Sequence, residues 1–279
     1  MSELIRARRV ARGVWQLADV LDDRAYLVVG ERRALLVDTM FGYGNLATVV
    51  EGLCDVPVEV ALTHRHFDHV GGAFQFGRVL MGEKDMGHFD VELARGRQGY
   101  AGLVEAGVVD PALPWWPRDG HVPCVEPVGE GDVLDLGGVT VEAVALPGHT
   151  PGGMGYLVRE RRILLSGDAV TPIMCLFFEE CLGVDAWLRT ISKMEDLPFD
   201  QFYTGHHRNG FSRESLAGFR ACGESFETER PLPWQHAALP QYRGSLRIHA
   251  GTDAESEDFR AIITPDLPPR HTHVHTDNG

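Results

Sequence analysis

The chain has 279 residues, of which 44% are hydrophobic and 24% charged, and its formal net charge is −14. This length and composition suit one large α/β domain or two small ones, and so acidic a chain repels phosphate backbones, which argues against nucleic acid as a partner. The N-terminus lacks the apolar core of a secretory signal, and we find no run of about 18 apolar residues that would span a membrane.

The five cysteines are scattered along the chain and include no C-x-x-C pair. An odd, scattered set favours reduced thiols over a disulfide framework, and therefore a cytoplasmic location. We expect a small-molecule substrate, no membrane association and no nucleic-acid partner. The tail after residue 230 leaves a homodimer open.

The first 75 residues predict short strands followed by a helix. Apolar residues at helical spacing predict a helix within 44–54, and the apolar run 57–63 predicts a buried strand that ends directly on a cluster of histidines. A short helix is expected to begin at Gly71. The earlier β-rich runs, separated by Asp and Gly turn signals, are 14–17, 24–29 and 33–38.

Residues 85–125 carry many glycines and prolines and show no clean period. We interpret them as a long, partly helical insertion, because long irregular stretches in compact domains are usually functional or disordered. Trp115 and Trp116 of this stretch, together with Phe177 and Phe178, are candidates for an apolar substrate wall. Packing in the core is an equally good explanation of all four.

Strand signals resume in the second half of the chain and alternate with helices. The helix expected at 185–197 has Asp185 as a candidate N-cap, and a second helix is expected at 212–227. The predicted strands are 133–136, 139–146, 154–158, 162–166 and 199–203, with two more in the tail at 245–249 and 259–264.

Two blocks of strands, each followed by helices, predict two sheets back to back with helices on the outside. We expect a catalytic domain over residues 1–230. Residues 231–279 are expected to form a C-terminal extension packed on the same domain.

Three histidines and an aspartate lie within six residues at the end of the strand predicted over 57–63. Because alternate residues of an extended segment point the same way, His64 and His66 can reach one ion from the same side. Asp68 and His69 follow the strand end and face a neighbouring position. Imidazole and carboxylate ligands suit Zn²⁺, and also Fe or Mn. A solvated turn that happens to be rich in histidine is the weaker explanation.

Three more metal-capable side chains follow predicted strands in the same manner. His149 lies in the turn Pro147–Gly153, Asp168 follows an apolar strand through Ser166-Gly167, and His206 follows Thr204-Gly205. Each alone would be interpreted as a structural loop residue. Together they predict a constellation at the carboxyl ends of strands, where open α/β layers gather ligands.

The series H-x-H-x-D-H, G-H-T-P-G, G-D and G-H, spread over residues 10–210, resembles the motifs of the metallo-β-lactamase superfamily. The resemblance implies an α/β fold, the αβ/βα four-layer sandwich. It implies two metal ions bridged by Asp168, and Asp38 resembles the family's buried supporting aspartate. The implied ligands are His64, His66 and His149 for the first ion, and Asp68, His69 and His206 for the second.

The resemblance implies a metal-dependent hydrolase that uses a metal-bridging hydroxide to cleave a thioester, ester or lactone. The two divalent ions would be Zn²⁺, with Fe or Mn as alternatives, and the catalytic residue Asp68 would orient the nucleophile or carry its proton. The bridging Asp168 resembles the glyoxalase II and lactonase branch. Arg208 or Arg213 could bind an anionic substrate tail. Other histidines, His236 among them, are left outside the ligand set.

Several alternatives stay open within the same fold. A persulfide dioxygenase would use a single iron held by His64, His149 and Asp168. A phosphodiesterase or a β-lactam hydrolase shares much of the ligand series. A binding protein without turnover is a third class, against which the full ligand set argues.

Overall fold

The first half of the chain forms a seven-stranded sheet whose strands follow the order of the sequence, β1 to β7. Strands β1 to β4 pair antiparallel, and β4 to β7 pair parallel. The structure is a computed structural model that describes residues 4–115, 122–251, 256 and 258–266. The strands are Arg6–Ala11, Val14–Ala18, Arg24–Val29, Ala34–Val37, Val58–Ala61, Arg78–Gly82 and Cys124–Val128.

The second half forms a six-stranded sheet in the order β14-β13-β11-β10-β9-β8. Its pairs are antiparallel except for β11 and β13, which run parallel. The strands are β8 (Val133–Asp135), β9 (Thr140–Ala145), β10 (Met154–Val158), β11 (Ile163–Gly167), β13 (Gln201–Thr204) and β14 (Phe211–Ser212).

The alternation of side chains along the strands explains how the two sheets stack. On β3, Tyr26 and Val28 face the core between the sheets, whereas Leu27 faces the opposite side. On β10, Tyr156 likewise faces the core between the sheets and Leu157 faces outward. Because both faces of each sheet are apolar, each needs cover on both sides.

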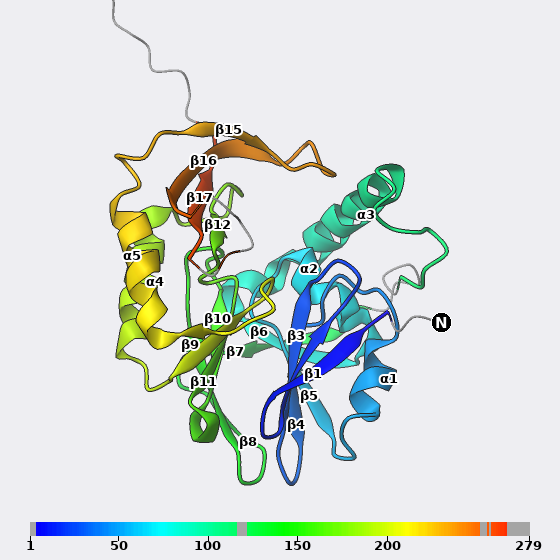
Figure 1. Ribbon diagram of the computed structural model, residues 1–279. Coiled ribbons are helices and arrows are strands. Elements are labelled where there is room, and N and C mark those ends of the chain that lie inside the picture. Colours follow the sequence, from blue (N-terminus) through cyan, green and yellow to red (C-terminus); the bar gives the residue numbers. More distant parts are fainter. Residues whose placement is uncertain (1–3, 116–121, 252–255, 257, 267–279) are drawn as a thin grey trace, which may run out of the picture.

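Helices supply the outer cover. Leu46 and Val50 of α1 and Phe67 and Val70 of α2 pack on the first sheet, and α4 and α5 cover the second sheet (Figure 1). The αβ/βα four-layer sandwich predicted from the sequence is therefore confirmed. The helices are α1 (Leu46–Glu51), α2 (Phe67–Val70), α3 (Phe89–Glu105), α4 (Val184–Asp196) and α5 (Leu216–Glu224), with 3-10 turns η1 (Gly71–Gln75), η2 (Glu83–His88), η4 (Arg159–Arg161) and η5 (Arg213–Ser215).

A third, four-stranded sheet in the order β12-β17-β16-β15 joins the tail to the middle of the chain. Strand β12 (Ile173–Cys175) pairs parallel with β17 (Arg260–Thr264), and β16 (Arg243–Ala250) pairs antiparallel with both β17 and β15 (Leu232–Gln235). Figure 1 shows this sheet at the end of the molecule that holds α2, away from β8.

The stretch 85–125 is more regular than the sequence pattern predicts. It contains the 17-residue helix α3, and its last residues enter β7 of the first sheet. The glycines that obscure the apolar period permit close packing, because a Cβ on Gly96 would lie 2.3 Å from the Phe67 ring. Trp116, like the histidines at 121, 271, 273 and 275, lies outside the described residues.

The cap predicted for α4 is wrong by two positions. Gly183, with φ of 80°, precedes the helix, and Asp185 lies within its first turn. An acidic side chain there still favours the helix, because the first-turn N–H groups carry partial positive charge.

Candidate metal centre

The segments that follow β5, β9, β11 and β13, including helix α2 after β5, bring all seven predicted metal-binding side chains to one end of the sandwich. They form three overlapping groups whose candidate ligand atoms lie within 4.8 Å of one another. The groups are His64, His66 and His149; His64, His69 and Asp168; and Asp68, His69 and His206.

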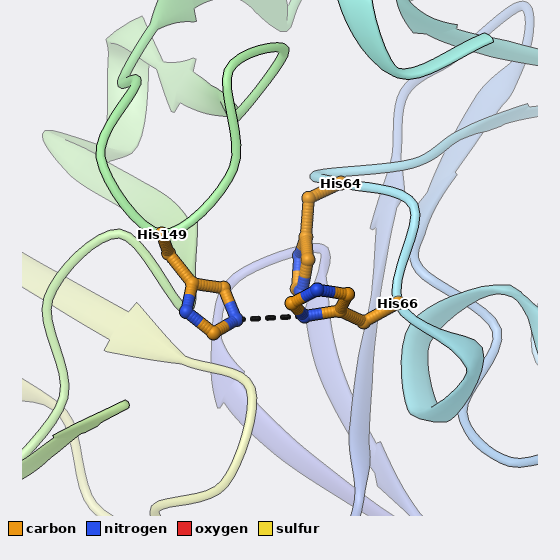
Figure 2. Close-up of side chains that lie close together, drawn as sticks. All are labelled: His64, His66 and His149. Carbon is orange, nitrogen blue, oxygen red and sulfur yellow. Dashed lines mark hydrogen bonds between the residues drawn. The ribbon is translucent and has the colours of Figure 1, made fainter. Parts of the chain in front are cut away.

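The first group consists of three histidines from two loops (Figure 2). Nδ1 of His66 lies 2.8 Å from Nε2 of His149. Nε2 of His64 is buried and has no hydrogen-bond partner among the described residues. A buried imidazole nitrogen without a partner is costly, because it loses its hydrogen bond to water. A cation shared by the three nitrogens removes that cost.

Asp68, His69 and His206 form a second group of donors beside the first, and Asp168 lies between these two groups. Nε2 of His206 lies 3.4 Å from both Nε2 of His69 and Oδ2 of Asp68. Oδ2 of Asp168 lies 3.1 Å from Nε2 of His206 and 3.8 Å from Nε2 of His149. Asp168 therefore faces both groups, as a bridging carboxylate would.

Each of the five histidines has its other ring nitrogen held by a neighbour. Such contacts fix the ring and are typical of histidines that bind metals. The donor set and its supports thus fit divalent metal ions. The contacts are His64 Nδ1 to Thr63 Oγ1 at 3.0 Å, His66 Nε2 to Glu180 at 3.1 Å, His69 Nδ1 to Asp38 at 2.8 Å, His149 Nδ1 to the Cys175 carbonyl at 2.7 Å, and His206 Nδ1 to Asp23 at 3.2 Å.

Asp38 occupies a left-handed backbone conformation with φ of 63° directly after β4. Its carboxylate accepts hydrogen bonds from the backbone N–H and the hydroxyl of Thr63 at 2.7 and 2.8 Å, in addition to its contact with His69. A non-glycine residue pays about 1–2 kcal/mol for this conformation. The contacts show what holds the aspartate there, and they place it where the resemblance implied.

Asp85 is a buried supporting residue that sequence reasoning missed. Its carboxylate accepts hydrogen bonds from the N–H of Arg65 at 3.2 Å, the hydroxyl of Thr150 at 2.7 Å and the N–H of Gly152 at 2.8 Å. It therefore ties the loop of His64 and His66 to the loop of His149. Nothing in its own sequence neighbourhood signals this, because the contact is made across the fold.

The two groups of histidines differ in electrostatics. Burial, together with the neighbouring histidines, holds the pKa of His64 well below its ordinary value and lowers the pKa of His149 to about 4. Burial also opposes the charged form of His69 and His206. Asp38 and Asp168 outweigh it at His69, and Asp168 and Asp23 outweigh it at His206, so the pKa of both histidines lies well above the ordinary value. His64 and His149 are thus neutral and ready to bind a cation, whereas His69 and His206 must release protons.

A buried ionic network adjoins His66. Glu180 contacts Nη2 of Arg65 at 3.0 Å and Nη1 of Arg95 at 2.6 Å, and Arg95 also reaches Glu92 at 2.8 Å. Burial alone would raise the pKa of Glu180, but hydrogen bonds from His66 and the arginines lower it below its ordinary range. The carboxylate that orients His66 is therefore kept ionised.

A cavity of about 440 Å³ opens above the two groups. His66, Asp68, His149, Asp168 and His206 form its floor. Its walls and roof are largely aromatic and aliphatic and come from β12, the segment that follows it, and the β15–β16 hairpin: Ile173, Phe177, Phe178, Trp234, Leu239 and Tyr242. Its size and apolar lining are those of a small-molecule site.

The structure sorts the earlier candidates for substrate contact. Phe177 and Phe178 line the cavity as expected. Trp115 does not line it. Trp115 is buried in the core between the first sheet and its covering helices, and it donates a hydrogen bond to the Phe41 carbonyl at 3.1 Å. Arg213 instead donates to the Glu195 carbonyl, and Arg208 is not among the described residues that line the cavity.

The family model described as the metallo-beta-lactamase superfamily matches residues 19–209. The chain therefore belongs to this superfamily. The resemblance stated from the sequence motifs is confirmed for the superfamily as a whole. Within the described residues, no helix combines the length and apolar character needed to cross a bilayer.

Two curated relatives cover about half of the chain. Acyl-coenzyme A thioesterase MBLAC2 of Homo sapiens is 32% identical over 164 residues, which are 52% of this chain and 57% of the relative. Hydroxyacylglutathione hydrolase GloC of Haemophilus influenzae is 31% identical over 147 residues, which are 50% of this chain and 62% of the relative. The matches thus span less than two thirds of either relative.

Solved structures support the fold. A metallo-beta-lactamase family protein from Thermus thermophilus has a TM-score of 0.55 and 21% identity, and covers 78% of this chain and 81% of its own. The sec-alkylsulfatase Pisa1 from Pseudomonas sp. has a TM-score of 0.60 and 17% identity, and covers 80% of this chain and 42% of its own. At these identities the likeness concerns the fold alone.

Proposed function

We propose that the protein hydrolyses a thioester, ester or lactone with the help of two divalent metal ions. The observation that carries this proposal is the pair of adjoining donor groups with Asp168 between them, at the floor of a largely apolar cavity. His64, His66 and His149 would hold one ion, and Asp68, His69 and His206 the other, with Asp168 shared. Zn²⁺ suits this donor set, with Fe or Mn as alternatives.

When bound, such ions supply Lewis acidity and lower the pKa of coordinated water to about 7. The chain's own residues supply the rest. Asp68 lines the cavity and its side chain is 37% exposed, so it can accept a proton at its free oxygen and return it to the leaving group. Phe177 and Phe178 displace water from the wall next to the reacting carbonyl.

The printed names of the relatives support the choice of reaction. One is a thioesterase named for acyl-coenzyme A, and the other is a hydrolase named for hydroxyacylglutathione. Both names describe hydrolysis of an acyl conjugate. The ligand set proposed for this chain has Asp168 as the bridging carboxylate, which resembles the branch that hydrolyses such conjugates and lactones.

Metal analysis combined with a substrate panel tests the proposal. Protein purified without added metal is expected to contain close to two Zn, Fe or Mn ions per chain. It is expected to hydrolyse members of a thioester, ester and lactone panel, and to leave β-lactams and phosphodiesters largely intact. A single iron per chain with oxygen consumption on a persulfide would contradict the proposal and favour a dioxygenase held by His64, His149 and Asp168.

A further inference from the structure

The cavity above the metal centre is roofed by a hairpin from the C-terminal part of the chain. Strand β15 pairs with β16, and the connecting residues fold back so that the N–H of His236 bonds the Tyr242 carbonyl at 2.9 Å. From this hairpin, we propose that the enzyme selects an uncharged, apolar acyl group, and that Trp234 and Tyr242 determine the preference. This inference rests on the proposed function, which supplies the acyl bond that is hydrolysed.

A continuous series of aromatic contacts connects the metal centre to the hairpin. The Phe178 ring lies 4.6 Å from the His66 ring and 4.2 Å from the Phe177 ring, centroid to centroid. Phe177 in turn lies 5.2 Å from Trp234 and 5.9 Å from Tyr242. These spacings are those of aromatic rings in direct contact. A substrate whose carbonyl lies at the floor must therefore place its acyl group along aromatic faces.

No lysine or arginine lines this cavity among the described residues. Arg95 lines a smaller adjoining cavity of about 110 Å³. Its guanidinium is already held by Glu92 at 2.8 Å and Glu180 at 2.6 Å. An anionic acyl group would lose its hydration without gaining a paired cation, which is unfavourable in an apolar site. The transfer of an apolar acyl group from water into the cavity is favourable.

The hairpin is anchored well enough to act as a fixed wall. Leu239 approaches α3 so closely that a Cβ on Gly102 would lie 2.8 Å from its methyl group. Gln235 donates a hydrogen bond to the Pro240 carbonyl at 2.8 Å and closes the hairpin. A wall that is formed before the substrate binds can discriminate between acyl groups by shape.

The test compares N-acetylcysteamine thioesters of octanoate, acetate and suberate with the zinc-loaded protein. Octanoyl and monosuberoyl differ only in a terminal carboxylate. We expect kcat/KM for octanoyl to exceed that for acetyl and for suberoyl by about tenfold or more. Trp234→Ala is expected to lower the ratio of octanoyl to acetyl kcat/KM about tenfold. Leu232→Ala removes an exposed apolar side chain of the same strand outside the cavity, and is expected to leave the ratio unchanged.

Equal hydrolysis of octanoyl and suberoyl, or equal effects of Trp234→Ala and Leu232→Ala, would overturn the inference. Calorimetric binding of 2-decanone, which cannot be hydrolysed, separates it from the proposed function. If no thioester, ester or lactone is cleaved but wild type binds 2-decanone about tenfold more tightly than Trp234→Ala, the cavity inference stands and the proposed reaction falls. If 2-decanone binds both equally, the inference falls whatever the reaction.

Discussion

The carboxylate of Glu180 lies 3.1 Å from Nε2 of His66, although 114 residues separate them in the sequence. His66 presents its other nitrogen, Nδ1, to the group formed with His149. Glu180 thus fixes which nitrogen of His66 faces the candidate metal. The same carboxylate holds Arg65 and Arg95, so the orientation of the ring is coupled to a buried ionic network.

Glu180→Gln is expected to weaken metal binding about 10- to 100-fold, because an amide holds the His66 ring less firmly. It also leaves Arg65 and Arg95 with Glu92 as their counter-charge. A chelator competition titration with zinc measures the loss. Glu179→Gln changes the neighbouring, exposed carboxylate and serves as the matched control. Equal zinc affinity of the two variants would show that Glu180 does not position the ligand.

Asp168→Ala is expected to lose metal and activity together, because Asp168 is the only carboxylate among the described residues that contacts both groups of histidines. Asp68→Asn is expected to retain at least one ion but to react far more slowly, since the amide cannot accept a proton. Metal content per chain and single-turnover rates distinguish the two variants. Asp55→Ala, at an exposed position, is the control. Normal activity of Asp168→Ala would refute the bridging role.

The charges of His206 and Asp168 predict how the metal-free protein responds to pH. Burial opposes the charged form of His206, but Asp168 outweighs it and raises the pKa of His206 well above 6.5, so its stabilising contribution is full below about pH 6.5 and is lost as pH rises through the raised value. Burial likewise opposes the charged form of Asp168, but His206 and His69 depress its pKa below 3.8, so its contribution is lost only as pH falls through that lowered value. Above pH 6.5, the metal-free protein should therefore lose stability.

Metal binding has the opposite dependence, because a cation must displace the proton from His206 and His69. The increase in Tm on adding zinc is expected to grow from about pH 6.5 to about pH 8.5. Differential scanning calorimetry of chelated and zinc-loaded samples across this range measures it. His206→Gln removes one of the titrating ligands and should flatten the trend. An increment that shrinks with pH would contradict this account of the site.

The parts of the site that the sequence predicted are those that local pattern determines. His64 and His66 alternate at a strand end, and His149 and Asp168 each follow an apolar strand, so period and turn signals place them. Their gathering at one edge follows from the order of the strands. The family model confirms the superfamily to which that order belongs.

The parts that the sequence did not predict depend on contacts between distant segments. Glu180 and Asp85 have no local signal, since each is defined by partners from other loops. Strand β6 was not predicted, because its apolar run is only Val79-Leu80-Met81, between Arg78 and Gly82. The roof of the cavity arises because β12 pairs with β17 and brings the tail, with Trp234, over the site. Hydrophobic periodicity does not indicate which distant strands pair with each other.

The three hydrogen bonds accepted by Asp85 make it the strongest candidate for a purely structural support of the site. Asp85→Ala leaves the N–H of Arg65, the hydroxyl of Thr150 and the N–H of Gly152 without this partner. Each buried donor left unsatisfied costs about 1–3 kcal/mol, and the free energy of unfolding is expected to fall by about 3 kcal/mol in total. Urea unfolding in the presence of a chelator measures this without a contribution from metal.

Glu83 lies on the same 3-10 helix and is exposed, so Glu83→Ala serves as the control. This substitution should change the free energy of unfolding by no more than about 0.5 kcal/mol. Because Asp85 joins the loops of His66 and His149, its loss should also loosen the first group of histidines, and zinc affinity should fall together with stability. If Asp85→Ala unfolds at the same urea concentration as Glu83→Ala, the carboxylate does not hold the two loops together. If stability falls but zinc affinity is unchanged, each loop keeps its geometry without the other.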